Sequence, residues 1–471
     1  MTLACRAAIR IAGIVAMFLA LGPIAAADAQ NSPLDVAKSL ADSALKDGWS
    51  YDFLAGLTTE IGPRLAGTDA EARAAEWAQA RLKAAGFDEV RIETTPMTAW
   101  LRGAETGHVV SPAPQSLVLT ALGGSVATPP EGIEAEIALF RTYAELLAAS
   151  PGSLAGKIAV VTQRQVRSAD GGGYGAANPI RRAGPTEAAR RGAVAYMHRS
   201  LGTDSHRLAH TGALNYVDGA PRIPAAALAN PDADQLERLA ARGATTVRIT
   251  LTPRTVEDAR FSTVVAEIKG RERPDEIVLI GAHLDSWDLG TGAIDDGAGC
   301  AIVSGAARLI GALPQRPRRT VRVVLFGAEE MDYSGPAYAK AHAGEAAKIV
   351  IAGESDFGAR KVYTMLVPPG TAGSLFARGL VAVLTPLGIF LNRDPARMGG
   401  DDIRGLQAAG VPVFSLRQDG LDYFDIHHTA DDTFDKVERA ELNQAVAAWA
   451  GFAYLAAETG VDFRALAAAQ R

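Results

Sequence analysis

The sequence predicts an α/β fold in which helices flank a mixed central sheet. From Phe261 onward, short apolar runs rich in β-branched residues alternate regularly with helical patterns, as in βαβ units. Several of these runs end in a histidine or a carboxylate, which is typical of the ligand-binding edge of an open α/β sheet. At 471 residues the chain is too long for one ordinary domain. We therefore expect two domains, or one domain with a large insertion.

The first 29 residues have the layout of a secretory signal peptide. Arg6 and Arg10 precede the apolar run Ile11–Leu21, and small residues follow up to Ala29. We expect cleavage near Ala29 and a soluble protein that is secreted or periplasmic; a retained N-terminal anchor is the alternative. No later stretch reaches the ~20 apolar residues of a transmembrane helix, so the mature chain is expected to lack an integral membrane segment.

Composition excludes some other classes. The formal net charge is −6, and the 47 Lys and Arg residues form no long basic run, so we expect no nucleic-acid partner. Removal of the signal leaves Cys300 as the single cysteine, which rules out an intramolecular disulfide. Cys300 falls on the apolar face of a predicted helix, where a small buried core residue is expected.

The main domain is predicted in two parts, residues 30–128 and 256–471. The first part begins with two helical patterns between residues 32 and 86, joined by a turn-rich link over 58–67. Strand patterns start at Asp88. The second part carries the regular strand and helix alternation and ends in a helix over about 437–459.

Residues 129–255 are predicted to form an inserted α/β module. A Pro-Pro pair opens this segment, which holds three short strand patterns, two helical patterns and a glycine-rich loop over 171–175. His206 and His210 lie in another of its loops. We expect these histidines to be solvated, unless the loop overhangs an active site.

The chain is organised around residues 276–299. An apolar strand runs to Ala282, so His283 and Asp285 lie at its C-terminal end. A glycine-rich segment then brings three more carboxylates back over this edge: Asp288, Asp295 and Asp296. Carboxylates this close repel one another unless their pKa values rise or a cation binds, and the adjacent histidine favours a cation.

Further polar residues follow other predicted strands. Glu329 and Glu330 end one apolar strand, and because neighbouring side chains at a strand end diverge, one can bind metal while the other acts as a general base. Asp356 ends the next strand, and His428 lies in a loop before the last helix. Each pattern alone is more often structural. However, all of these elements are predicted to share one sheet edge, which would bring together His283, Asp295, Glu330, Asp356 and His428. Two histidines and three carboxylates suit two zinc ions with one bridging carboxylate.

The ordered motifs HLDSWDLGTGAIDDGAG, GAEE, ESD and HHTADDT resemble the co-catalytic zinc exopeptidase family of bacterial leucyl aminopeptidases and glutamate carboxypeptidases. The segments IGPRLAGT and TPPEGIEAE extend the resemblance over nearly all of the mature chain. It implies a zinc exopeptidase domain interrupted by a protease-associated domain, and relatives suggest a homodimer. One departure is GGDDI at 399–403, where relatives have a Gly-Thr-Asp segment.

The resemblance also implies roles for individual residues. Asp295 would bridge two zinc ions, with His283 and Asp356 on one ion and Glu330 and His428 on the other. Glu329 would be the general base that activates a zinc-bridging hydroxide. Asp285 would orient His283, and Asp432 would do the same near His428. The family pattern further implies a cis peptide between Asp295 and Asp296.

The function expected from this resemblance is hydrolysis of dipeptides or short peptides. An aminopeptidase acting on longer peptides is the alternative. A non-catalytic binding protein on the same fold is an alternative of another class, and the retention of every expected ligand argues against it.

Overall fold

The structure is a computed structural model that describes residues 1, 32–392 and 398–469. The predicted signal peptide and its cleavage site near Ala29 therefore lie outside the described residues. Within the described residues, no helix is both long and apolar enough to cross a bilayer.

A five-stranded mixed sheet forms the centre of the fold. Its order is β1, β10, β12, β11, β13, with β11 parallel to both β12 and β13, and β10 antiparallel to β1 and β12. The predicted mixed α/β class is thus confirmed. The strands span Glu89–Leu101 (β1), Arg254–Ile268 (β10), Arg273–His283 (β11), Arg319–Phe326 (β12) and Ile349–Glu354 (β13).

Helices cover this sheet because their apolar residues recur at helical spacing. The almost wholly buried α9 and α14 pack against each other and against the sheet, and both contribute to the largest apolar core. Thr68 caps α3 by accepting from the Glu71 N–H at 3.4 Å. The long helices are α1 (Pro33–Ala44), α2 (Trp49–Gly56), α3 (Asp69–Ala84), α9 (Ala298–Gly311), α10 (Ser334–Ala341), α11 (Leu375–Leu384) and α14 (Arg439–Glu458). The short ones are α12 (Arg404–Ala408), α13 (Tyr423–Ile426) and α15 (Phe463–Ala468).

A second, three-stranded sheet lies beside the first. It pairs β14 with β15 and β16, and an isolated bridge between Ala352 and Val413 connects its neighbourhood to β13. The strand before the His428 loop therefore belongs to a separate small sheet, whereas we expected all the site elements to share one sheet edge. The strands span Val362–Leu366 (β14), Phe390–Asn392 (β15) and Ser415–Gln418 (β16).

The third sheet has eight strands in the order β3, β2, β9, β5, β6, β7, β8, β4. We call this sheet and helices α4–α8, residues 105–251, the insert, and the rest of the described chain the main body. The insert includes β2–β4, which come before the predicted boundary at residue 129. Its strands are β2 (Glu105–Ser111), β3 (Gln115–Leu117), β4 (Leu119–Ala121), β5 (Ile133–Phe140), β6 (Ile158–Val161), β7 (Ala195–Arg199), β8 (Ala225–Leu228) and β9 (Thr246–Leu251).

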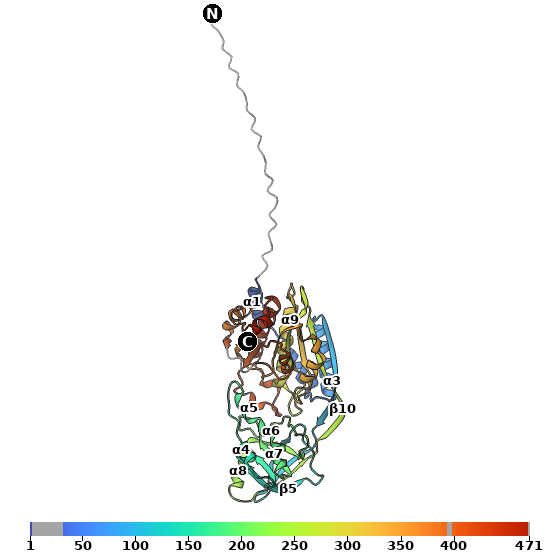
Figure 1. Cartoon of the computed structure of the whole chain (residues 1–471), viewed down its shortest axis with the longest axis vertical. Coiled ribbons are helices and arrows are strands. Elements are labelled where there is room, and N and C mark those ends of the chain that lie inside the picture. Colours follow the sequence, from blue (N-terminus) through green and yellow to red (C-terminus); the bar gives the residue numbers. More distant parts are fainter. Residues whose placement is uncertain (2–31, 393–397, 470–471) are drawn as a thin grey trace.

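The insert forms one end of the molecule. Figure 1 shows α4, α7, α8 and β5 gathered at that end, with α1 and α9 toward the other. Apolar side chains line both faces of its sheet, in two separate core clusters. Its helices span Tyr143–Ala148 (α4), Gly172–Ala177 (α5), Pro179–Arg182 (α6), Gly184–Arg190 (α7) and Asn230–Ala240 (α8).

Candidate metal centre

Three adjacent parallel strands bring most of the predicted site residues to one edge of the central sheet. His283 is the last residue of β11, Glu329 and Glu330 follow β12, and Asp356 follows β13. Asp295 reaches the same place from the segment before α9, and its peptide bond to Asp296 is cis, as expected.

The carboxylate of Asp295 lies between the two histidines. Its Oδ1 is 3.2 Å from Nε2 of His283, and its Oδ2 is 3.1 Å from Nε2 of His428. On the first side, Oδ1 of Asp356 is 3.4 Å from His283 Nε2. On the second side, Oε2 of Glu330 is 3.1 Å from His428 Nε2. The five residues thus form two half-sites, each with one histidine and one carboxylate, around a shared aspartate.

Each histidine has its other ring nitrogen beside a backbone carbonyl. Nδ1 of His283 is 3.0 Å from the Asp285 carbonyl oxygen, and Nδ1 of His428 is 3.2 Å from the Thr211 carbonyl oxygen. A carbonyl only accepts, so these contacts place the proton on Nδ1. In the neutral form of each ring with the proton on Nδ1, Nε2 keeps the lone pair that metal ligation requires.

Oδ1 of Asp285 lies 3.5 Å from Nδ1 of His283, the residue that Asp285 was expected to orient, but the Asp285 and Asp432 carboxylates also bind backbone N–H groups that we did not expect. The Asp285 carboxylate accepts from the backbone N–H groups of Glu329 at 3.0 Å and Glu330 at 3.3 Å, while its own backbone carbonyl faces His283. The Asp432 carboxylate accepts from the N–H groups of residues 293–295, at 2.7–3.3 Å. Asp285 therefore fixes the Glu329–Glu330 turn, and Asp432 fixes the segment that carries Asp295.

Arg64 connects the loops behind the site. Its side chain, which is fully buried, donates to the carbonyls of Leu284 at 2.6 Å, Thr291 at 2.6 Å and Gly292 at 3.0 Å. It thereby joins the loop after His283 to the loop before Asp295. Arg64 lies in the IGPRLAGT motif, which indicated a resemblance but no role.

Sequence reasoning missed His427. Its ring stacks on that of His428 with the centroids 3.5 Å apart, and its Nε2 lies 3.6 Å from Oδ2 of Asp295. Together with Asp295 and His428 it forms a third cluster of metal-ligating atoms. Asp288, in contrast, points away and pairs with Arg102 at 2.8 Å.

Burial and repulsion from neighbouring carboxylates make Glu329 and Glu330 costly to ionise. Burial raises the pKa of Glu330 to about 7 and holds the pKa of Glu329 well above its usual range. Burial alone would lower the pKa of His428, but Glu330 and Asp295 outweigh it and raise the pKa to about 9. The Asp356, Asp285 and Asp295 carboxylates raise the pKa of His283 in the same way. A bound cation would relieve this repulsion.

The donor set fits a zinc pair. Tetrahedral zinc with bonds of about 2.0–2.1 Å separates neighbouring ligand atoms by about 3.3 Å, and the four histidine–carboxylate contacts of the two half-sites measure 3.1–3.4 Å. Oδ2 of Asp295 and Oε1 of Glu330 are buried without a hydrogen-bond partner. Nitrogen and oxygen donors grouped in this way match zinc better than calcium or magnesium, which prefer oxygen alone.

A cavity of about 210 Å³ opens over the two half-sites. Side chains of the insert line one side of it, including Tyr174, Asn178, Arg181 and Arg182. Arg181 is 3% exposed, and its guanidinium carbon lies 5.5 Å from the ring centre of Tyr174. Among the described residues, no carboxylate lies within ion-pairing distance of this guanidinium. The insert thus aims a buried cation into an acidic cavity.

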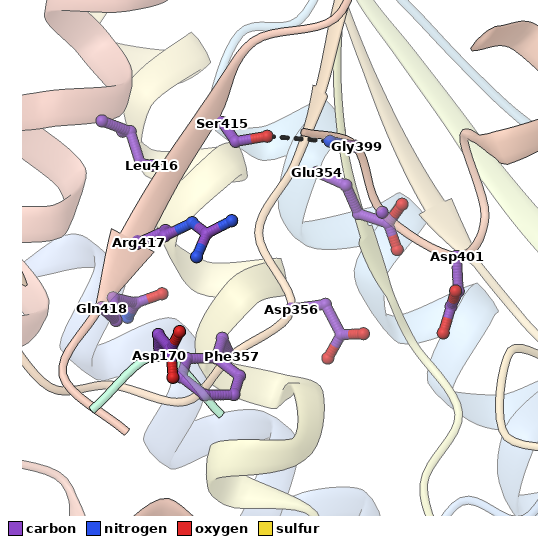
Figure 2. A pocket seen from close by; sticks show the side chains of 11 residues that line it. Asp170, Glu354, Asp356, Phe357, Gly399, Asp401, Ser415, Leu416, Arg417 and Gln418 are labelled. Atoms are coloured by element: carbon purple, nitrogen blue, oxygen red, sulfur yellow. Dashed lines mark hydrogen bonds between the residues drawn. The ribbon is translucent and has the colours of Figure 1, made fainter. Parts of the chain in front are cut away.

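A second pocket of about 320 Å³ adjoins the first and shares Asp356, Phe357 and Asp401 with it. Figure 2 shows the acids Glu354, Asp356 and Asp401 facing the β16 segment across this pocket. The Gly399 N–H donates to Ser415 Oγ at 3.0 Å, which holds the 399–401 turn against β16. The GGDDI departure from the family pattern therefore lines this second pocket.

Comparisons with known proteins show the family of this chain. Residues 263–453 match Peptidase family M28. Carboxypeptidase Q of Bos taurus is 36% identical over 430 residues, covering 90% of this chain and 89% of that protein. Carboxypeptidase Q of Homo sapiens is 34% identical over 435 residues, with the same coverage.

Solved structures have the same architecture. A Peptidase M28 precursor from Shewanella amazonensis SB2B is 46% identical and superposes with a TM-score of 0.88, covering 91% of this chain and 98% of that one. A zinc aminopeptidase from Bacillus subtilis, at 18% identity, covers 88% of this chain and 96% of its own with a TM-score of 0.64. That second likeness concerns the fold alone.

Proposed function

Because this chain belongs to Peptidase family M28, whose members are zinc metallopeptidases, we propose that it is a two-zinc exopeptidase that hydrolyses dipeptides or short peptides. The observation that carries this proposal is the Asp295 carboxylate, whose two oxygens each face the Nε2 atom of a different histidine. One ion would be held by His283, Asp356 and Asp295, and the other by His428, Glu330 and Asp295.

When bound, a zinc pair polarises the scissile carbonyl and lets water attack it near neutral pH. Glu329 lines the cavity, and its Oε2 lies 4.0 Å from His283 Nε2. It takes the proton from the attacking water and returns it to the leaving amine. The Asp285 carboxylate keeps Glu329 in place by accepting a hydrogen bond from the backbone N–H of Glu329.

Arg181 supports a substrate with a free C-terminus. Its buried guanidinium faces the cavity from the insert, within reach of the carboxylate of a short peptide. A charge-assisted pair of this kind is formed by a dipeptide but not by a long peptide whose C-terminus lies far away.

The insert is a protease-associated domain that restricts access to the site. The cavity lining contributed by α5 and α6 supports this assignment, since long peptides would have to pass these helices. We also propose that the protein is exported after cleavage near Ala29. N-terminal sequencing of the mature protein from a native host tests the export proposal.

The function is tested by metal analysis and a substrate panel. We expect two zinc ions per chain, loss of one in His283→Ala or His428→Ala, and faster cleavage of free dipeptides than of C-terminally amidated dipeptides or longer peptides. Arg181→Met should raise KM for free dipeptides about tenfold and leave KM for the amides nearly unchanged, whereas Arg207→Met, which loses an ion pair inside the insert, changes neither.

Two results would overturn the proposal. Absence of bound metal in zinc-replete protein, or full activity after chelation, would exclude the zinc mechanism. Processive trimming of long peptides from the N-terminus would favour the aminopeptidase alternative.

A further inference from the structure

The Nδ1 atom of His428 contacts a carbonyl of the insert, whereas His428 itself belongs to the main body. Thr211 lies in the loop between β7 and β8. Its N–H donates to the His428 carbonyl oxygen at 3.0 Å, and its own carbonyl oxygen lies 3.2 Å from Nδ1 of His428. We propose that docking of the insert, through Thr211, is a condition for tight metal binding at the His428 half-site. This inference rests on the proposed two-zinc function.

The Thr211 carbonyl fixes both the tautomer and the orientation of the ring. A metal on Nε2 requires the proton on Nδ1, and Thr211 is the acceptor for that proton. Arg181 also approaches Nδ1, at 3.5 Å, but a guanidinium only donates and cannot accept from it. Thr211 therefore supplies the acceptor that a ligating His428 needs.

The other half-site does not depend on the insert in this way. Nδ1 of His283 is held by the carbonyl of Asp285, which is two residues away in the same loop. The two half-sites are therefore asymmetric. Loosening the insert should weaken the His428 half-site and leave the His283 half-site unchanged.

A chain of polar contacts connects Thr211 to the main body. The Thr211 hydroxyl donates to the Ala121 carbonyl at 2.9 Å and accepts from Arg102 Nη2 at 3.1 Å. Arg102 in turn pairs with Asp288, which follows the His283 loop, at 2.8 Å. Thr211 is thus positioned by Arg102, which belongs to the main body and is itself held there by Asp288.

Apolar packing fixes the same junction. Trp287, beside Asp288, enters a cluster that includes Ala121 and Ala213 of the insert. Gly123 leaves room for this indole, because a Cβ atom there would lie 2.1 Å from the ring. The backbone around Thr211 is fixed as well, since Gly123 N–H donates to the Gly212 carbonyl at 3.0 Å. The docking of the insert on the main body and the position of the Thr211 carbonyl are therefore coupled.

The test compares two isosteric variants. Thr211→Val removes the hydroxyl that connects Arg102 to Thr211, while Thr120→Val removes another hydroxyl that binds Arg102, at 2.6 Å, without touching Thr211. Zinc affinity is measured by competition with a calibrated chelator. We expect Thr211→Val to weaken one of the two ions about tenfold, as loss of a ligand-orienting contact typically does, and Thr120→Val to weaken neither.

A second variant and a second readout keep the test independent of folding defects. Asp288→Asn weakens the Arg102 anchor from the main body and should also loosen one ion. In the wild type, zinc should slow amide hydrogen exchange in residues 209–214, because coupling between two sites is reciprocal. Equal weakening of both ions, unchanged affinity in Thr211→Val and Asp288→Asn, or exchange that zinc leaves unaltered would each overturn the inference. A wild type without zinc would instead refute the proposed function.

Discussion

Glu329 and Glu330 are neighbours in the sequence but differ in their surroundings. Oε2 of Glu330 lies 3.1 Å from His428 Nε2, and Glu330 belongs to a cluster of metal-ligating atoms. Glu329 lies farther from the histidines, with its Oε2 atom 4.0 Å from Nε2 of His283. We predict that Glu329→Gln lowers kcat by ~10² to 10⁴ with both zinc ions retained, because glutamine cannot accept the proton.

Glu330→Gln should fail differently. It removes a charged ligand, so zinc affinity falls and excess zinc partly restores activity. Metal content and kcat of both variants, measured at several zinc concentrations, check the assignment. If Glu329→Gln loses zinc and Glu330→Gln loses only turnover, the two roles are reversed.

Glu71 predicts a pH dependence of stability. It is fully buried, Oε1 accepts from the Ser262 N–H at 2.9 Å, and Oε2 has no partner. Burial raises its pKa to about 8. The folded state therefore holds a proton that the unfolded state releases above pH ~4.5. This contribution to stability is present at low pH and is lost as the pH rises toward 8, by up to about 1.4 kcal/mol per pH unit.

We accordingly predict that Glu71→Gln, which keeps the shape of the neutral acid, stabilises the protein at pH 8 and flattens the decline between pH ~5 and 8. Chemical denaturation of chelated protein across this range measures the effect. Glu60→Gln, at an exposed surface ion pair, serves as the control. An unchanged pH profile in Glu71→Gln would contradict the prediction.

At the scale of single residues, the sequence indicated the metal-ligand positions better than the residues that hold those ligands in place. The histidines and carboxylates of the two half-sites could be singled out because each follows a recognisable strand or motif. The contacts of Asp285 and Asp432 could not, since both carboxylates bind backbone N–H groups whose positions depend on the folded loops. His427 was passed over because only the three-dimensional arrangement distinguishes it from His428.

At the scale of elements, Arg64 joins two loops that carry site residues. We predict that Arg64→Met lowers the free energy of unfolding by about 3–5 kcal/mol, because buried carbonyls at Leu284, Thr291 and Gly292 lose a charged donor. Zinc affinity should fall with it. Thermal unfolding with and without zinc gives both quantities.

Arg273→Met is the matched control, since this arginine forms an exposed pair with Glu276. A loss of stability no larger than that of the control would show that Arg64 is replaceable.

The same scale shows where pattern reading stops. Strand β11 and helix α9 were predictable because apolar runs with clear endings define them. We predicted a turn-rich link over 58–67, but the chain stays helical as far as Ile61. Leu57, at the start of these helical turns, packs into the core. The strands β14 and β15 were not predicted, since each is only three to five residues long and pairs with partners distant in sequence.

At the scale of the whole molecule, the insert docks on the main body through several separate contacts. Arg167 of the insert binds the Asp425 carboxylate at 2.6 Å and the Thr203 carbonyl at 3.0 Å, and Thr203 N–H donates to the Phe424 carbonyl. We predict that Arg167→Gln reduces the preference for dipeptides over longer peptides by up to about fivefold, as expected for a pair worth up to about 1 kcal/mol.

Relative kcat/KM values for a dipeptide and a tetrapeptide measure that preference. Arg164→Gln breaks a pair with Asp234 inside the insert and should leave the preference unchanged. An equal effect in the two variants would show that docking does not control access.

The contact between His428 and Thr211 joins residues 217 positions apart. Closing a loop of that length costs conformational entropy before the contact can stabilise the chain. We therefore expect contacts of this kind to form late in folding. The His283 half-site needs only neighbouring strands of the central sheet, together with the short return to Asp295. Zinc that meets the chain before the insert has closed therefore finds one half-site formed and the other still without the acceptor that orients its histidine.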